Sequence, residues 1–285
     1  MERFKKLWFH MFTRELSEEK WWMRKINLCK QRGVEIVRIR GSGRFYRQLC
    51  YDRKRLLQYH LHLTFFLKQK GAYFYIEECV LPVQCYFEDG EIIKHKICSF
   101  KQDNNQQQDT PAFKESNILS YNKRFSYDRR SAVQYAERWW NSYNPSFHRF
   151  SVDCTNYVSQ CLLAGGAPMR GVPDRSHGWW YKDNNWSYSW AVAHSLRWYL
   201  SGSTEGLKGK EIESADQLKP GDIICYDFSG DGRWDHTTIV VSKDANNMPL
   251  VNAHTDNSRH RYWSYEDSTA WTPYIQYKFF QIGHS

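Results

Sequence analysis

The chain has 285 residues, of which 41% are apolar and 17% aromatic, so it can bury a sizeable core as one large or two small domains. No stretch approaches the roughly 18 to 20 apolar residues that a membrane-spanning helix needs. Residues 1–22 alternate charged with aromatic side chains, where a signal peptide would carry an apolar core. These features argue against a helical membrane protein and against export by a standard signal. We expect a globular, cytoplasmic protein, with release by lysis or a specialised compartment as the alternatives.

The net charge of +9 is spread unevenly along the chain. Residues 1–124 carry 24 Lys and Arg against 14 Asp and Glu, a net +10, whereas residues 125–285 carry 16 against 17, a net −1. A basic half of this kind is typical of a protein that meets an anionic polymer, such as nucleic acid, an acidic membrane surface or an anionic wall polymer. The alternative is a solvated basic face without a specific ligand.

The first hundred residues predict a basic α+β accessory domain, in which a helix leads into an antiparallel sheet. Apolar spacing predicts a helix over 17–31 and strands over 34–40, 55–69, 72–78 and 80–87. Turns are expected at Gly41-Ser42-Gly43, Lys70-Gly71 and Glu88-Asp89-Gly90. His60 and His62 alternate along one strand, and without a third ligand we interpret them as a sheet-surface pair and not as a metal site.

A polar segment over 101–124 divides the chain. It contains Gln106-Gln107-Gln108, several Asn and Asp residues and Pro111, with little apolar periodicity. We predict a linker there, between domains over 1–100 and 125–285. In the second domain, helices are expected over 128–143, 154–164 and 190–200, and strands over 222–228, 236–242, 249–255 and 275–282.

Eight cysteines are scattered along the chain without a CxxC pair or a paired His spacing. This pattern argues against a zinc ribbon or a dense disulfide scaffold, so we expect free thiols in a reducing compartment, with no metal or cofactor. Cys154 and Cys161 lie on one predicted helix about 10 Å apart, which is beyond the roughly 7 Å limit for a disulfide.

Cys154 is the first residue of the helix predicted over 154–164, with Asp153 as its expected N-cap. A helix N-terminus carries free N–H groups and about half a positive charge, which favour thiolate over thiol. The same N–H groups can stabilise the oxyanion that forms when a thiolate attacks a carbonyl. We therefore predict that Cys154 is the most reactive thiol and a nucleophile; the alternative is a small buried apolar residue, as free cysteines commonly are.

His236 stands where a polar loop becomes the apolar strand predicted over 236–242, and there it can act as the base for a thiol. Such a base needs a partner that fixes its tautomer. Asn252 and His254 are two residues apart, and therefore on one face of the next strand, which a turn at Asn246-Asn247 brings back beside His236. We prefer His254 as the orienting residue and keep Asn252 as the second choice; either can instead be a polar rim group.

A series of short motifs, in this order, resembles the bacterial putative amidase domain over roughly residues 125–265. They are Asp153-Cys154-Thr155-Asn156-Tyr157-Val158-Ser159-Gln160, Trp179-Trp180-Tyr181, Ser189-Trp190, Pro220-Gly221-Asp222-Ile223-Ile224, Asp235-His236-Thr237 and Asn252-Ala253-His254-Thr255. The chain is also similar, more distantly, to the NlpC-type cell-wall endopeptidases of the papain-like superfamily, whose Asp-Cys-Ser helix and Gly-Asp strand precede the His strand.

The resemblance implies a papain-like domain, in which a helix carrying the nucleophile packs on an antiparallel sheet carrying the base. It implies that Cys154 is the nucleophile, His236 the general base and then acid, and His254 or Asn252 the third polar member. The reaction is then amide or peptide hydrolysis through an acyl-enzyme. Thr155-Asn156 replaces the Ser-Gly of the cell-wall enzymes, so their peptide specificity does not follow.

Substrate contacts are expected beside the two catalytic positions and from an aromatic cluster. The predicted residues are Asp153, Asp235, Trp179, Trp180 and Trp190, the last three in a run that also holds Tyr181, Trp186 and Tyr188. Aromatic rings stack well on sugars and peptides, and the alternative is a packed lid over the sheet.

The loop before His236 resembles a calcium-binding loop in part. Asp227, Ser229, Asp231, Gly232 and Asp235 occupy relative positions 1, 3, 5, 6 and 9 of that pattern. Position 12 is Thr238 instead of a bidentate Glu, so we interpret the loop as a polar turn that delivers His236.

Three classes of function remain open from the sequence. The first is a thiol amidase or peptidase acting on a peptide such as the stem of peptidoglycan, with the basic half holding an anionic polymer. The second is an acyl or amide transferase with the same Cys–His site, because capture by an amine or by water depends on water access. The third is a non-catalytic wall- or peptide-binding module, which the intact Cys154 and His236 disfavour.

Overall fold

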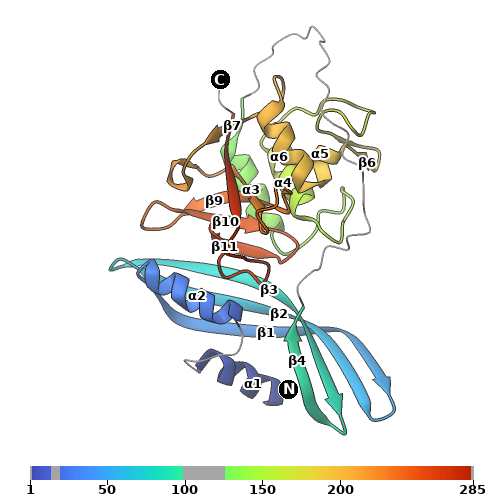
Figure 1. Cartoon of the computed structure of the whole chain (residues 1–285), viewed down its shortest axis with the longest axis vertical. Helices are drawn as coiled ribbons and strands as arrows, with labels where there is room; N and C mark the ends of the chain where they lie inside the picture. Colours follow the sequence, from blue (N-terminus) through green and yellow to red (C-terminus); the bar gives the residue numbers. More distant parts are fainter. Residues whose placement is uncertain (1, 14–19, 99–125, 284–285) are drawn as a thin grey trace.

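The computed structural model describes residues 2–13, 20–98 and 126–283; the predicted linker over 101–124 lies outside them. The chain is α+β, and its main sheet has ten strands, all paired antiparallel. The strand order is β1-β2-β3-β11-β10-β9-β8-β12-β7, and β4 pairs with β3 beside this path. Figure 1 shows the N-terminal strands below and the C-terminal strands above, each part with its own helices.

The N-terminal part covers one face of its strands with two helices. Its elements are α1 (Glu2–Thr13), α2 (Lys20–Gln31), β1 (Val34–Tyr51), β2 (Lys54–Gln69), β3 (Tyr73–Glu88) and β4 (Glu91–Ile97). Alternate residues of β2, such as Leu63 and Phe65, are buried in one cluster with Trp8 of α1 and Trp22 of α2. The other face is open, since Phe66 and Phe74 remain 36% and 47% exposed.

Several sequence predictions for this part are corrected. The segment Gly41-Ser42-Gly43 is not a turn, because β1 runs through it with a β2 partner at each residue, from Gly41↔Leu63 to Gly43↔Leu61. The chain reverses later, where Asp52 adopts the left-handed φ of 49°. The strands predicted over 72–78 and 80–87 are the single strand β3, and α1 and β4 were not predicted.

The C-terminal part packs its helices on one face of the remaining strands (Figure 1). Its helices are α3 (Arg129–Trp139), α4 (Cys154–Ala164), α5 (Tyr188–Ala191) and α6 (Ala193–Gly202), with a 3-10 turn over Ala215–Gln217. Its main-sheet strands are β7 (Gly209–Ile212), β8 (Ile223–Asp227), β9 (His236–Lys243), β10 (Pro249–Ala253), β11 (Ser258–Tyr262) and β12 (Gln276–Ile282), and β5 (Tyr181–Lys182) and β6 (Asn185–Trp186) form a small ribbon. The predictions for α4, β8, β9 and β12 agree with these bounds to within a residue or so, whereas β7 and β11 were not predicted.

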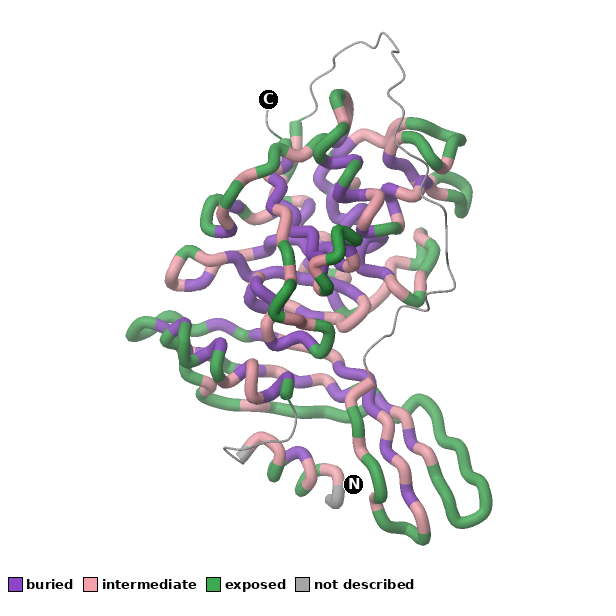
Figure 2. The backbone as a smooth tube through the Cα atoms, viewed as in Figure 1, coloured by how far each residue is buried: buried purple, intermediate pink, exposed green. Residues whose placement is uncertain are grey.

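Helix α4 lies at the centre of this part. Every residue from Cys154 to Leu162 is buried, and Figure 2 shows the surrounding interior in purple. Strand β9 separates two clusters: Ile239 and Val241 pack with α4, whereas Val240 packs on the opposite side. This alternation decides which β9 side chains can meet the start of α4.

The two predicted domains share their main sheet, which the sequence did not indicate. Strand β11 pairs with β3 at Ser258↔Cys79 and Arg259↔Glu78, and Arg259 Nη1 contacts Glu78 Oε1 at 2.9 Å. Helix α2 adds a further link, because Arg24 donates to the backbone carbonyl of Ser268 at 2.6 Å. None of the described helices combines the length and apolar character that crossing a membrane requires.

Candidate active site

Asp153 fixes the start of α4 through its carboxylate. Oδ1 accepts from the Phe150 N–H at 2.9 Å and from Asn156 Nδ2 at 3.0 Å, and Oδ2 lies 2.8 Å from His254 Nδ1. The Asp153 N–H donates to Thr255 Oγ1 at 3.1 Å. Asp153 is therefore a structural anchor between the helix and the end of β10. The sequence predicts a substrate contact at Asp153, but both of its carboxylate oxygens are engaged within the fold.

His254 binds two acceptors at once. Its Nδ1 faces the Asp153 carboxylate, and its Nε2 lies 2.7 Å from the backbone carbonyl of Trp139. The ring also stacks on Tyr157 of α4, with centroids 4.1 Å apart. Both ring nitrogens of His254 therefore have hydrogen-bond partners, so His254 forms a buried pair with Asp153 and has no ring nitrogen free to orient His236.

Replacing His254 should destabilise the protein, because His254 contacts the buried Asp153 carboxylate. We expect His254→Gln to lower the free energy of unfolding by about 2–3 kcal/mol, because the buried Asp153 carboxylate loses its hydrogen-bond partner. Urea unfolding measures this change. The control is His177→Gln, since His177 meets Asp174 at 2.7 Å but its side chain is 47% exposed; a change above roughly 1 kcal/mol there would argue against burial as the cause.

Cys154 lies at the first position of α4 and is only 2% exposed. Its Sγ is 3.8 Å from Thr155 Oγ1, and Thr155 Oγ1 lies 3.3 Å from Thr237 Oγ1. Burial raises the pKa of the thiol above its ordinary value, although hydrogen bonds to the sulfur oppose the shift. The expectation of a thiol activated by the helix N-terminus is thus not met in this state, because desolvation outweighs the local donors.

His236 is the first residue of β9, and its ring lies on the face of the sheet opposite to Cys154. Nε2 is 3.3 Å from Tyr265 Oη, and the ring centroid lies 5.1 Å from that of Tyr265 and 5.6 Å from that of Tyr226. Burial, and to a smaller extent the charge of Arg261, lowers the pKa of His236 to about 3. Within the described ranges no hydrogen bond joins His236 to Cys154.

The register of β9 and β10 explains why the predicted orienting residues do not reach His236. Asn252 pairs with Ile239, so Asn252 and His254 share the α4 face of the sheet, whereas His236 follows Val240 on the other face. Asn252 instead donates to Glu137 Oε1 at 2.9 Å and accepts from the His260 N–H at 2.9 Å. The prediction that Asn252 and His254 lie on one face holds, but Tyr265 is the residue that contacts the candidate base.

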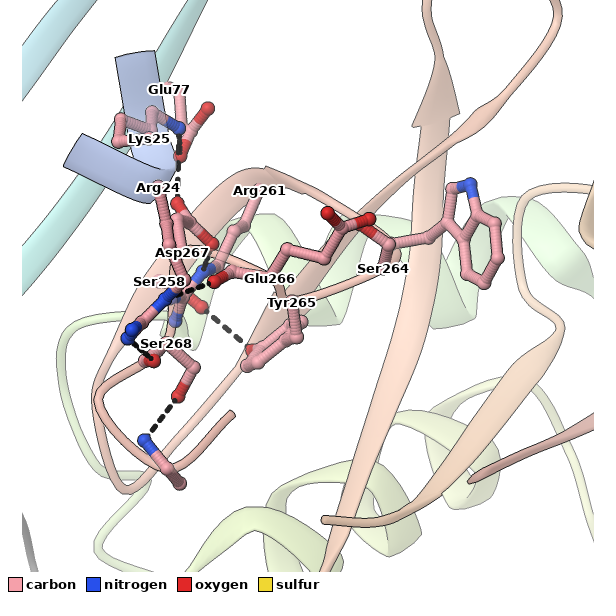
Figure 3. A network of polar contacts seen from close by, with 12 residues as sticks. Arg24, Lys25, Glu77, Ser258, Arg261, Ser264, Tyr265, Glu266, Asp267 and Ser268 are labelled. Carbon is pink, nitrogen blue, oxygen red and sulfur yellow. Dashed lines mark hydrogen bonds and ion pairs between the residues drawn. The ribbon is translucent and has the colours of Figure 1, made fainter. Parts of the chain in front are cut away.

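Tyr265 had no signal in the sequence, because it lies outside any alternating or motif segment. It adopts a left-handed φ of 55°, uncommon for a bulky residue. Its hydroxyl also lies 3.1 Å from Ser258 Oγ, and the Arg261 guanidinium lies 4.2 Å from the centre of its ring. Asp267 accepts from Arg261 Nε at 2.9 Å, which completes the support of this loop (Figure 3).

The predicted aromatic substrate surface is interior. Trp179, Trp180 and Trp190 are 0%, 1% and 0% exposed. Their indole N–H groups are satisfied within the fold: Trp179 donates to Ser159 Oγ at 2.9 Å and Trp190 to Asn156 Oδ1 at 2.8 Å. These rings support α4 and are not available for stacking on a ligand in this state.

The loop before His236 closes around Asp227. The Asp227 carboxylate accepts from the backbone N–H groups of Gly230 and Gly232, both at 2.7 Å, so the loop uses this side chain as an internal cap. Burial raises the pKa of Asp235 to about 6, although Asp235 Oδ2 accepts from the Phe228 N–H at 3.1 Å. Within the described ranges no three His, Cys, Asp or Glu side chains converge as a metal site would require.

The site thus combines a cysteine at the start of a buried helix, an Asp–His pair beside that cysteine, and a histidine at the start of a neighbouring strand, a composition typical of thiol hydrolases. The family described as putative amidase domain matches residues 126–280, more than half of the chain, and the chain belongs to this family. It is 46% identical over 272 residues, or 91% of this chain and 85% of the relative, to the uncharacterized protein YhbB of Bacillus subtilis (strain 168).

A second relative is more distant. The uncharacterized protein YjcM of Bacillus subtilis (strain 168) is 30% identical over 141 residues, which cover 46% of this chain and 31% of that protein. No solved structure matches the chain. Membership of this family supports an amide hydrolase in general terms.

Proposed function

We propose that the protein is a cysteine-dependent amide hydrolase with Cys154 as nucleophile and His236 as general base. The observation that carries this proposal is the contact between the start of α4 and the start of β9: Cys154 Sγ lies 3.8 Å from Thr155 Oγ1, which lies 3.3 Å from Thr237 Oγ1. Cys154 is thereby close to the residue that follows His236, although the His236 ring is turned toward Tyr265. The arrangement resembles that of papain-like enzymes, in which a helix N-terminus and a strand start supply the reacting pair.

The proposal requires one movement, a turn of the backbone at the start of β9 that carries the His236 side chain from the Tyr265 face of the sheet to the Cys154 face. The backbone must turn because alternation along a strand fixes the face that each side chain occupies. The bond from its Nε2 to Tyr265 Oη is long at 3.3 Å, and charge-neutral hydrogen bonds of this kind contribute only about 1 kcal/mol. This movement takes the ring away from Tyr226 and Tyr265, the aromatic surroundings in which burial lowers its pKa. On the Cys154 face the imidazole is a stronger base, as proton transfer near neutral pH requires.

In the proposed reaction, the imidazole of His236 takes the thiol proton while Sγ attacks the amide carbonyl carbon. The free N–H groups at the start of α4 stabilise the oxyanion. The imidazolium then gives its proton to the leaving amine as the C–N bond breaks, and a water molecule hydrolyses the thioester with His236 again as base. The buried Asp153–His254 pair holds Cys154 in place throughout.

A cell-wall peptide is the substrate class that the NlpC-type resemblance supports, and a cytoplasmic peptide amide is the alternative that agrees with the predicted location. The transferase reading uses the same steps, with an amine in place of water. A specific observation favours a different class, the non-catalytic binding module: the His236 ring turns away from Cys154 toward Tyr265, and burial raises the pKa of the Cys154 thiol.

Alkylation by iodoacetamide at neutral pH separates the hydrolase from the binding module. The exposed Cys50 serves as an internal reference within the same protein. For the hydrolase we expect Cys154 to react at least as fast as Cys50 and to slow by at least about tenfold in His236→Ala, because the imidazole removes the thiol proton. Peptide mass spectrometry measures the alkylation rates of Cys154 and Cys50. If Cys154 reacts more slowly than Cys50, and at the same rate in the parent and in His236→Ala, the binding module is established.

A further inference from the structure

The open face of the N-terminal sheet carries a row of arginines along β1. Arg38, Arg40 and Arg44 pair in register with Phe66, Thr64 and His60 of β2, and these side chains alternate with residues such as Ile39, which packs into the core on the other face. All three arginines are exposed. Side chains on one face of a strand repeat at about 7 Å, so Arg38 and Arg40 are neighbours on this face, and Arg44 lies about 14 Å beyond Arg40, past Ser42.

These arginines lack acidic partners in the described part of the chain, whereas nearby carboxylates are already engaged. Glu78, which lies on the same face, binds His62 Nε2 at 2.8 Å and Arg259 Nη1 at 2.9 Å. At the tip of the same hairpin, Arg53 meets Asp89 at 3.7 Å and Lys54 meets Glu88 at 3.6 Å. Positive charge along this stretch of β1 is therefore uncompensated in the described part of the chain, whereas Arg53 and Lys54 at the tip are paired.

The row of arginines ends at Arg44, which lies near His60, and His60 lies within electrostatic reach of Arg149. Arg44 lies across from His60 on the neighbouring strand, and the exposed Arg149 of the C-terminal part acts on the same ring. Burial first, and then repulsion from Arg149 and Arg44, lowers the pKa of His60. The Tyr46 ring, 52% exposed, lies 4.5 Å from the ring of His60. Two guanidinium groups near an imidazole, which can donate a hydrogen bond from one ring nitrogen, are suited to binding an anion.

This site adjoins the candidate nucleophile. The Arg149 guanidinium lies 3.9 Å from the centre of the Tyr143 ring, and the Tyr143 ring lies 4.8 Å from the ring of His254. His254 in turn binds Asp153, the residue before Cys154. Packed side chains thus connect Arg149 on the sheet face to the start of α4.

We propose that Arg44, His60 and Arg149 bind a carboxylate of an extended acidic peptide, and that Arg40 and Arg38 bind further carboxylates along β1. Planar guanidinium groups match carboxylates with two parallel hydrogen bonds. An extended peptide presents alternate side chains at the same spacing of about 7 Å. The inference deepens the proposed function, on which it rests, because it identifies the amide substrate as part of a polycarboxylate chain and gives the basic half its role.

The test measures binding of fluorescein-labelled poly-L-glutamate by fluorescence anisotropy to the full chain carrying Cys154→Ala. We expect the double variant Arg44→Gln, Arg149→Gln to bind at least about tenfold more weakly, with a shallower dependence on salt. The matched control is Arg53→Gln, Lys54→Gln, which removes the same charge from the paired hairpin tip and should change affinity by less than about twofold. The variant Arg38→Gln, Arg40→Gln should show an intermediate loss.

Three results would overturn the inference: no binding by the parent protein, equal losses in the tip control and the Arg44/Arg149 variant, or tighter binding of labelled oligothymidylate than of poly-L-glutamate. The last would make the face a nucleic-acid surface. All substituted arginines are exposed, so the variants should unfold at the temperature of the parent. Because the binding protein lacks the thiol, the outcome does not depend on whether Cys154 proves to be the nucleophile.

Discussion

Lys25→Met should lower the free energy of unfolding by about 3–5 kcal/mol, as expected when one partner of a buried ion network is removed. The Lys25 side chain is 1% exposed; its Nζ binds Glu77 of β3 and lies 3.2 Å from Asp267 of the loop after β11 (Figure 3). Burial alone would lower the pKa of Lys25, but Glu77 and Asp267 raise it by more. The lysine therefore stays charged, and its loss leaves Glu77 uncompensated.

The control is Lys30→Met, because Lys30 lies on the same helix and is exposed; its effect should stay within about 0.5 kcal/mol. Urea unfolding of both variants, followed through tryptophan fluorescence, measures the difference. Equal stability of the two proteins would show that the Lys25 network does not hold α2 against the C-terminal part.

The pH dependence of the parent protein gives a second measure of the same network. Burial raises the pKa of Asp267, but Arg261 and Lys25 lower it by more, so the net shift is downward. A carboxylate with a lowered folded pKa stabilises the protein above its unfolded value near 3.9, and this contribution is lost as the pH falls further. The stability difference between parent and Lys25→Met should therefore shrink as the pH falls below about 4.

The elements that the sequence predicted well are those with strong local signals. Helix α4 follows from the Asp153 N-cap position, an unbroken buried run and Gly165, and β8 and β9 are apolar runs bounded by turns. Strand β11, Ser258–Tyr262, was missed because its polar side chains show no alternation. Its partner β3 lies far away in the sequence, and no local pattern reports such a pairing.

Some features of the candidate site could likewise be predicted from local sequence patterns, and others could not. The position of Cys154 at a helix start and the shared face of Asn252 and His254 depend on short-range periodicity, and both appear in the structure. The rotamer of His236 and its contact with Tyr265 depend on how the loop after β11 folds back. That loop is held by Lys25 through Asp267, with Arg261 between Asp267 and Tyr265. Lys25 and Asp267 are far apart in the sequence, so no local sequence pattern could predict this interaction.

The dependence of Tyr265 on this network links the basic half to the candidate base. Tyr265 holds a left-handed φ of 55°, a conformation that persists for a bulky residue only when its surroundings impose it. Arg261 over the ring and Ser258 at the hydroxyl supply that constraint. Residues of the N-terminal half thereby influence which way His236 points, in addition to the anion-binding face that we propose for β1.

His236→Ala should reduce kcat/KM for amide hydrolysis by roughly 10²–10⁴-fold, the range that general acid–base catalysis contributes, and Cys154→Ala should abolish turnover. Each substitution removes one member of the proposed reacting pair and leaves the contact between Asp153 and His254 in place. The assay follows release of the amine from acidic peptide substrates, and mass spectrometry of acid-quenched samples detects an acyl group on Cys154. A parent protein that accumulates the acyl form, and a His236→Ala variant that does not, would identify the step at which the imidazole acts.

Two further variants test whether His236, and not His254, is the base. Tyr265→Phe keeps the ring and removes the hydroxyl that holds His236, so it should change the pH profile of kcat/KM more than its maximum value, as a positioning residue does. His254→Gln should lower stability, as argued from its contact with Asp153, and at a temperature where it remains folded it should lose clearly less activity than His236→Ala, because the pair positions Cys154 without taking its proton. If instead His254→Gln loses activity as fully as His236→Ala while folded, the imidazole on the α4 face is the base, and the ring of His236 has a structural role beside Tyr265.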